Sequence, residues 1–150
     1  MNAYETPVLL LTGYLGSGKT TLLNRILTNE RGIRFAVIVN DIGEVNIDAS
    51  LIQKGGIVDQ QDDSLIALQN GCICCTLVGD FQKAVDELIE KYNPDRLIIE
   101  PSGVGKLSEI VAAVEKCKAN HPEMEIGGCA TVVDAGKCRM YMKNFGEFFL

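Results

Sequence analysis

The sequence lacks several features that define other classes of protein. No apolar run approaches the roughly 20 residues that a membrane-spanning helix needs, and the opening stretch MNAYETPVLLLTGY carries no basic segment of a signal peptide. Positive charge is also scarce, because 14 Lys and Arg face 20 Asp and Glu and leave a formal net charge of −6. These shortages predict a cytoplasmic protein with no nucleic acid and no membrane among its partners.

Internal repeats and low-complexity tracts are missing too, so the 150 residues are expected to form one globular domain over 1–150. The chain ends on FGEFFL, which holds no turn signal and no polar close. We therefore expect a piece of a longer domain, incomplete at its C-terminus.

Short apolar runs alternate with helical patterns, and this alternation predicts an α/β fold with a mostly parallel sheet. The expected strands are 7–12, 35–40, 64–70, 96–100 and 129–135. Helices are expected over 19–29, 76–91 and from Leu107 to Cys117, with a further amphipathic stretch in 136–150. Residues 41–63 read as loops with room for a short hairpin.

The stretch GYLGSGKTT fits the phosphate-loop pattern G-x-x-x-x-G-K-[ST], with a strand before it and a helix after it. Its glycines allow backbone N–H groups to point at one anion. Lys19 would reach the β- and γ-phosphates of a nucleoside triphosphate, and the Thr20 hydroxyl would bind Mg²⁺. The predicted phosphate-binding set is Gly13, Gly16, Ser17, Gly18, Lys19, Thr20 and Thr21. The fold expected is thus a P-loop NTPase three-layer sandwich.

Ligands of an open parallel sheet bind at the carboxyl ends of its strands. Glu100 ends the apolar run RLIIE, where it could hold Mg²⁺ through water or orient the attacking water, and Gly103 follows it. Asp41 and Glu44 follow the second strand and could complete a metal shell. The alternatives are an ordinary carboxylate at a strand end and a solvated loop.

Three of the six cysteines, Cys72, Cys74 and Cys75, lie within GCICC. Thiolates select Zn²⁺ and similar soft ions over Mg²⁺, and no second C-x-x-C exists to close a structural zinc site. We expect an open, exchangeable metal site at a strand end, with thiol pKa values lowered by a helix that begins at Thr76. Packing cysteines and a redox pair are the alternatives.

The other candidates are isolated along the chain. Cys117, Cys129 and Cys138 stand on separate elements and are expected to be packing residues. His121 precedes Pro122 in a loop and is expected to be structural, with a ligand role left open.

Taken together, GYLGSGKTT, NDIGEVNID, NGCICCTL, IIEPSGVG and TVVDA resemble the N-terminal domain of CobW-type metallochaperone GTPases, a branch of the SIMIBI class of P-loop GTPases. The resemblance covers about 7–135 and implies GTP hydrolysis coupled to metal handling. It implies that Cys72, Cys74 and Cys75 bind the metal, that Lys19 and Thr20 contact phosphate and Mg²⁺, and that Glu100 is the second acidic motif. Asp41 stands where the family's NEFGE version has Glu, and Glu44 matches that version's second acid. The implied ligands are GTP, Mg²⁺ and Zn²⁺, with Co²⁺ or Ni²⁺ also fitting, and the implied partner is a client metalloprotein.

One departure is the missing N-K-x-D motif, which reads guanine in this family. Guanine specificity therefore comes from the resemblance alone. Two alternatives stay open: a zinc-binding module without turnover, and an ATP-dependent P-loop kinase.

Overall fold

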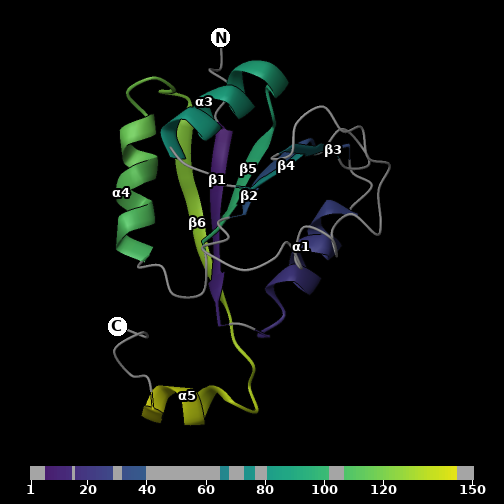
Figure 1. Ribbon diagram of the computed structural model, residues 1–150, viewed down its shortest axis with the longest axis vertical. Helices are drawn as coiled ribbons and strands as arrows, with labels where there is room; N and C mark the ends of the chain where they lie inside the picture. Colours follow the sequence, from purple (N-terminus) through teal and green to yellow (C-terminus); the bar gives the residue numbers. More distant parts are fainter. Residues whose placement is uncertain are drawn as a thin grey trace.

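The computed structural model describes residues 6–14, 16–28, 32–39, 65–67, 73–76, 81–101 and 107–144, with the backbone alone for 65–67 and 73–76. These residues form one six-stranded sheet in the order β3-β4-β2-β5-β1-β6 (Figure 1). Its strands are β1 (Thr6–Gly13), β2 (Phe35–Val39), β3 (Leu65–Ala67), β4 (Ile73–Thr76), β5 (Arg96–Glu100) and β6 (Met124–Val132). The helices are α1 (Lys19–Leu27), α3 (Phe81–Tyr92), α4 (Leu107–Cys117) and α5 (Cys138–Asn144). Every described pairing is parallel except that of β3 with β4.

Burial follows the position of each strand in the sheet. All five residues of β2, FAVIV, are buried, and only Arg96 of β5 is not. Such unbroken apolar runs are typical of parallel strands covered on both faces. In contrast, β6 alternates between exposed and half-buried residues after Met124, because β1 is its one neighbour among the described strands.

Two apolar clusters separate the helices onto opposite faces of the sheet. On one face, α3 and α4 bury side chains such as Leu88 and Val114 against Leu10 and Ile38. On the other, α1 packs Leu23 and Leu27 over strand residues from β1, β2 and β5. Figure 1 shows the same division, with α1 apart from α3 and α4. The predicted three-layer α/β sandwich with a mostly parallel sheet is confirmed.

Several predicted boundaries hold and others do not. The strand at 96–100 and the helix from Leu107 to Cys117 match the structure, and the predicted helix 19–29 ends at Leu27. The predicted helix 76–91 begins too early, because residues 73–76 pair with β2 as a strand and the helix starts at Phe81. The predicted strand 129–135 begins at Met124 and ends at Val132 instead, because the chain pairs with β1 over that whole range. Only 65–67 of the predicted strand 64–70 lie in β3.

The amino ends of β2 and β5 are joined by a charged pair. The Arg34 guanidinium donates to both oxygens of Asp95 at 3.2 and 3.3 Å, and the Arg34 amide donates to the same carboxylate at 2.8 Å. These hydrogen bonds from Arg34 hold the pKa of Asp95 below its ordinary value and raise the pKa of Arg34. Both side chains are almost half exposed, so the pair fastens the surface of the sheet rather than its core.

None of the helices in the described ranges has the length and apolarity needed to cross a membrane.

Candidate functional site

The loop that follows β1 depends on glycine. A Cβ at Gly13 would lie 2.4 Å from the Val132 carbonyl oxygen and 2.8 Å from Ser17 Oγ, so no larger residue fits without movement. Gly18 has a φ of +103°, which L side chains rarely adopt, and it is the N-cap of α1. The Ser17 amide donates to the Tyr14 carbonyl at 3.0 Å and closes the turn between them. The loop therefore has no room for a side chain at Gly13, which lies against the Val132 carbonyl of β6.

The start of α1 is suited to an anion. In this fully described helix the N-cap provides no side-chain hydrogen bond, and the first turn holds no acidic residue. The N-terminus of α1 thus keeps its partial positive charge with no side-chain cap and no carboxylate in its first turn. Ser17 Oγ is buried and has no hydrogen-bond partner among the described residues. Helix termini of this kind bind phosphate and other anions.

Lys19 brings a formal positive charge into the loop. The residue is 8% exposed, and its Nζ donates to the carbonyl oxygens of Gly13 at 2.8 Å and Tyr14 at 3.0 Å. The Glu100 Oε1 atom lies 3.9 Å from the same Nζ. A buried ammonium needs such partners, because burial of an unpaired charge is costly. The structure therefore brings together Lys19, which was predicted to contact phosphate, and Glu100, which was predicted to hold Mg²⁺ or orient the attacking water.

Glu100 is 5% exposed and ends β5, next to β1 and β2. Its row across the sheet contains Thr76 of β4, Val39 of β2 and Glu100 itself. The row before it contains Cys75, Ile38 and Ile99. Glu100 thus lies in register with the carboxyl end of the strand that carries two of the predicted metal thiols.

The cysteine motif is placed differently from its prediction. Cys74 and Cys75 lie inside β4, which pairs with β2 on one side and β3 on the other. The predicted arrangement of a strand end directly under a helix N-terminus is wrong, because β4 continues to Thr76 and α3 begins at Phe81. Thr76 is accordingly a strand residue and not a helix cap. Three strand spacings separate β4 from β1, or roughly 14 Å.

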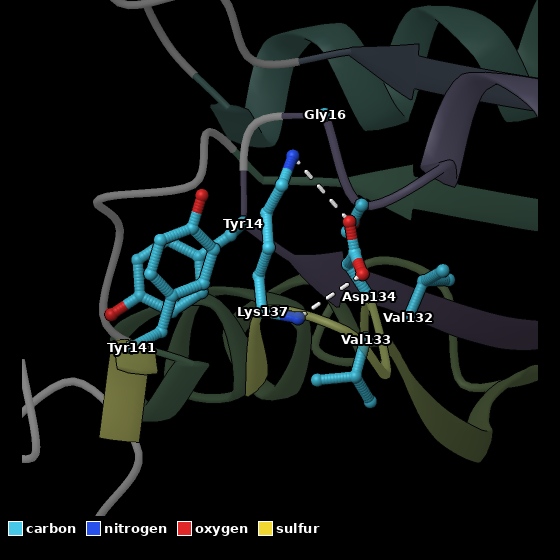
Figure 2. Close-up of a pocket in the computed structure, with 8 residues that line it drawn as sticks. Tyr14, Gly16, Val132, Val133, Asp134, Lys137 and Tyr141 are labelled. Carbon is cyan, nitrogen blue, oxygen red and sulfur yellow. Dashed lines mark hydrogen bonds and ion pairs between the residues drawn. The ribbon is translucent and has the colours of Figure 1, made fainter. Parts of the chain in front are cut away.

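A small hollow beside the phosphate loop contains residues that the motif search missed (Figure 2). Its lining combines Tyr14, Gly16 and Ser17 with Val132, Val133, Asp134, Lys137 and Tyr141. The rings of Tyr14 and Tyr141 lie 4.9 Å apart between centroids, so α5 packs against the loop. Asp134 accepts hydrogen bonds from the Gly136 and Lys137 amides at 2.9 and 3.2 Å and fixes the turn into α5. An Asp followed by Ala-Gly is a turn signal in the sequence, but its nearness to Tyr14 depends on β6 lying beside β1.

The remaining predicted residues fall into two groups. Thr20 and Thr21 lie in the first turn of α1, half-buried and exposed respectively. Asp41, Glu44, Cys72 and Gly103 lie outside the described residues, as do the loops predicted for 41–63. Within the described part of the chain, His, Cys, Asp and Glu do not gather in a group of three or more that could hold a metal ion.

The isolated cysteines and the histidine differ from one another. Cys117 is buried in the core, as predicted for a packing residue, whereas Cys129 is exposed on β6 and the packing prediction is wrong there. Cys138 is half-buried. His121 is buried, and each of its ring nitrogens faces a carboxylate oxygen, which leaves neither nitrogen open to a metal.

Comparison with known families shows which family the chain belongs to. The family described as CobW/HypB/UreG, nucleotide-binding domain, matches residues 7–147. The chain belongs to the CobW/HypB/UreG family. The predicted resemblance to CobW-type proteins is therefore confirmed. The phosphate loop, Lys19 and Glu100 described above lie within the matched range.

Curated relatives in this family come from bacteria and eukaryotes. A zinc chaperone CobW of Sinorhizobium sp is 37% identical over 139 residues, which are 89% of this chain and 38% of that protein. The zinc-regulated GTPase metalloprotein activator 1 of Dictyostelium discoideum is 45% identical over 109 residues, 68% of this chain and 23% of that protein. The zinc chaperone YjiA of Escherichia coli K12 is 34% identical over 143 residues, 92% of this chain and 43% of that protein.

Solved structures support the same fold. The Zn(II)-bound YjiA GTPase from E. coli superposes with a TM-score of 0.71 at 33% identity, over 97% of this chain and 45% of that chain. The 54 kDa signal recognition particle protein from Aeropyrum pernix K1, in complex with GDP, gives a TM-score of 0.58 at 19% identity, over 96% of this chain and 32% of that one. The second likeness concerns the fold alone. The chain spans less than half the length of these relatives.

Proposed function

We propose that the chain binds GTP, hydrolyses it slowly, and uses its nucleotide state to gate the binding and delivery of a thiophilic metal ion to a client metalloprotein. Zinc is the metal named for the CobW, YjiA and D. discoideum relatives, and Co²⁺ or Ni²⁺ would suit the same ligands. The observation that carries the proposal is the buried Lys19 ammonium, which lies at a glycine loop before an uncapped helix.

The phosphate groups would bind where backbone N–H groups and the Lys19 ammonium converge. The α1 N-terminus and the turn from Gly13 to Gly18 provide the N–H donors, and Ser17 Oγ offers a buried hydroxyl. The full set proposed to contact nucleotide is Gly13, Gly16, Ser17, Gly18, Lys19, Thr20, Thr21 and Gly103. On binding, Lys19 would exchange its contacts with the Gly13 and Tyr14 carbonyls for phosphate oxygens.

Hydrolysis requires a group that positions water in line with the γ-phosphate. Glu100 is suited to this role, because it is buried, ends the strand next to β1, and lies 3.9 Å from Lys19. The Thr20 hydroxyl and the Glu100 carboxylate are oxygen donors of the kind that Mg²⁺ prefers, and Asp41 or Glu44 could add to them. A bound Mg²⁺ would neutralise charge on the phosphate oxygens.

The cargo metal would bind to the thiolates of Cys72, Cys74 and Cys75. Support comes from register, because Cys75 lies one row before the row of Thr76, Val39 and Glu100. A shift of Glu100 in β5 on nucleotide binding would reach β4 through β2, because β2 lies between β5 and β4 in the sheet. The linkage is reciprocal, so metal should change nucleotide affinity by the same factor.

The test is a Zn²⁺ titration of the protein with and without a non-hydrolysable GTP analogue. We expect the zinc affinity to differ by about 5- to 100-fold between the two states. Cys74→Ser should weaken zinc binding, whereas Cys129→Ser, which alters an exposed thiol on β6, should leave it unchanged. Equal zinc affinities in both states would contradict the gating.

The choice of base needs a separate measurement, because the chain holds no N-K-x-D. We expect GTP to displace a labelled GTP analogue more effectively than ATP does. A preference for ATP, together with phosphate transfer to an acceptor other than water, would favour the kinase alternative. Zinc binding without phosphate release would favour a module without turnover.

A further inference from the structure

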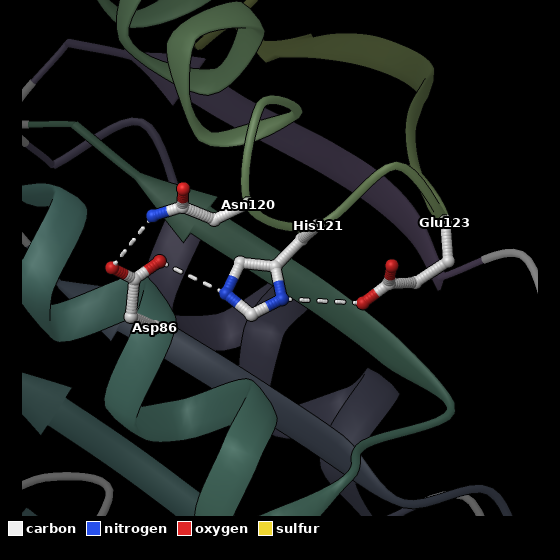
Figure 3. Close-up of polar contacts among 4 residues, drawn as sticks. All are labelled: Asp86, Asn120, His121 and Glu123. Atoms are coloured by element: carbon white, nitrogen blue, oxygen red, sulfur yellow. Dashed lines mark hydrogen bonds and ion pairs between the residues drawn. The ribbon is translucent and has the colours of Figure 1, made fainter.

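A buried histidine between two partly exposed carboxylates lies at the end of the sheet opposite the phosphate loop. His121 is 6% exposed and stands between the end of α4 and the start of β6. Its Nε2 lies 2.9 Å from Oδ1 of Asp86 on α3, and its Nδ1 lies 3.2 Å from Oε1 of Glu123. Figure 3 shows the imidazole ring between the two carboxylates, one from each side. The nucleotide and metal sites proposed above do not use these residues.

The two contacts depend on a proton. An ionised carboxylate only accepts hydrogen bonds, and a neutral imidazole has one N–H and one lone pair. A neutral ring could therefore donate to only one of Asp86 and Glu123, and its lone pair would face the other carboxylate. The imidazolium form donates to both, and charge-assisted hydrogen bonds of this type are about twice as strong as neutral ones.

The surroundings hold the three side chains in place. Asn120 Nδ2 donates to the second oxygen of Asp86 at 3.2 Å. The His121 amide donates to the Cys117 carbonyl at 2.9 Å, and the His121 carbonyl accepts from the Met124 amide at 3.0 Å. Because the backbone of His121 is hydrogen-bonded to α4 on one side and to β6 on the other, the point from which the ring projects is fixed.

We propose that His121 is a proton-dependent latch that holds α3 against the turn between α4 and β6. Among the described residues, the charged groups hydrogen-bonded to the ring are Asp86 from α3 and Glu123 from the turn, while α4 and β6 contribute the backbone groups of Cys117 and Met124. The latch is closed when the imidazole carries both protons. Loss of one proton replaces an attraction with a repulsion and loosens α3, the helix that follows β4 in the chain.

The single histidine makes the test direct, because the ring signals of a ¹⁵N-labelled sample belong to one residue. In acidic solution we expect two slowly exchanging ring N–H protons, and after the pH is raised until the ring loses a proton we expect one. Over the same range the folding equilibrium constant should fall about tenfold, as expected for one lost charge-assisted hydrogen bond. Amide exchange should quicken in α3 near Asp86.

Asp86→Asn is the decisive variant, because an amide can donate to the lone pair of the neutral ring. The fold-change of its folding equilibrium constant with pH should be smaller than that of the parent by a factor of at least about three. Glu123→Gln makes the same test from Nδ1 if the first variant folds poorly. Glu125→Gln, which alters an exposed carboxylate on β6, should keep the parental pH dependence. A parent whose stability does not fall when the ring loses its proton, or an Asp86→Asn variant with the parental pH dependence, would overturn the proposal.

Discussion

Charged side chains gather at both ends of the sheet, but their partners differ. At the amino end, His121 is enclosed by Asp86 and Glu123, and Arg34 donates to both oxygens of Asp95. At the carboxyl end, the Lys19 ammonium contacts two loop carbonyls and lies 3.9 Å from Glu100, beside a helix start that no side chain caps.

This contrast separates charges that pair within the fold from charges that lie at the proposed nucleotide site. In the His121 cluster, side-chain donors face side-chain acceptors, so an added ligand would have to displace one of them. Near Lys19, the buried Ser17 hydroxyl has no hydrogen-bond partner among the described residues, and Gly18, the N-cap of α1, provides no side-chain cap. Burial of charge alone therefore does not indicate a binding site; donors left over after pairing do.

The largest expected effect is on nucleotide binding. Lys19→Ala should weaken GTP binding about a thousandfold, because two charge-assisted hydrogen bonds to phosphate are worth about 4 kcal/mol together. Calorimetric titration with a GTP analogue measures this loss. Lys118→Ala, at the amino end, removes a lysine paired with Glu115 and should leave the affinity unchanged. An unchanged affinity in Lys19→Ala would remove the difference between the two ends.

The next effect concerns the narrow turn after β1. Gly13→Ala should destabilise the fold by about 3 kcal/mol, because the added Cβ would meet the Val132 carbonyl at 2.4 Å and the backbone has a φ of +142°. Urea unfolding checks the value. Gly32→Ala is the matched control: its φ is +71°, and nothing lies within 4 Å of the added atom. If both variants lose the same stability, backbone conformation rather than the contact with β6 explains the loss.

The smallest effect is expected at the exposed Arg34–Asp95 pair. The folded-state pKa of Asp95 is lowered by its hydrogen bonds to Arg34, so its stabilisation is present above the unfolded value of about 3.9 and is lost as pH falls through the folded value. Asp95→Asn should reduce the drop in melting temperature between neutral and acidic pH slightly. Thermal melts across that range would show identical pH profiles for parent and variant if the pair contributes nothing.

The sequence predicted the parts of the fold that local pattern determines. Unbroken apolar runs gave β2 and β5, and the phosphate-loop motif located the turn at Gly13 and the start of α1 at Lys19. The place of Glu100 at the carboxyl end of β5 could be predicted because the apolar run RLIIE ends there. The contact of Lys19 with Glu100 follows from the adjacency of β1 and β5.

Prediction failed where pairing between distant segments overrode local preference. A helix was predicted to begin at Thr76, but residues 73–76 form a strand because β2 and β3 lie on either side. The role of His121 was hidden because Asp86 lies 35 positions away, and the hollow near Tyr14 requires α5 to pack on the loop. No periodicity or motif carries this information.

The central place of β1 also has a consequence for synthesis on the ribosome. Val8 of β1 pairs with Leu97 of β5 and Ile126 of β6. Among the described strands β1 is made first, and it has neither of these neighbours until about 90 further residues have been made. At roughly 5 to 20 residues per second, that delay is about 5 to 20 seconds. During this interval the apolar strand VLLL is exposed to other chains, and parallel pairing of this kind is slow to form. The loop that would bind phosphate consequently acquires its shape only after β5 and β6 have been made.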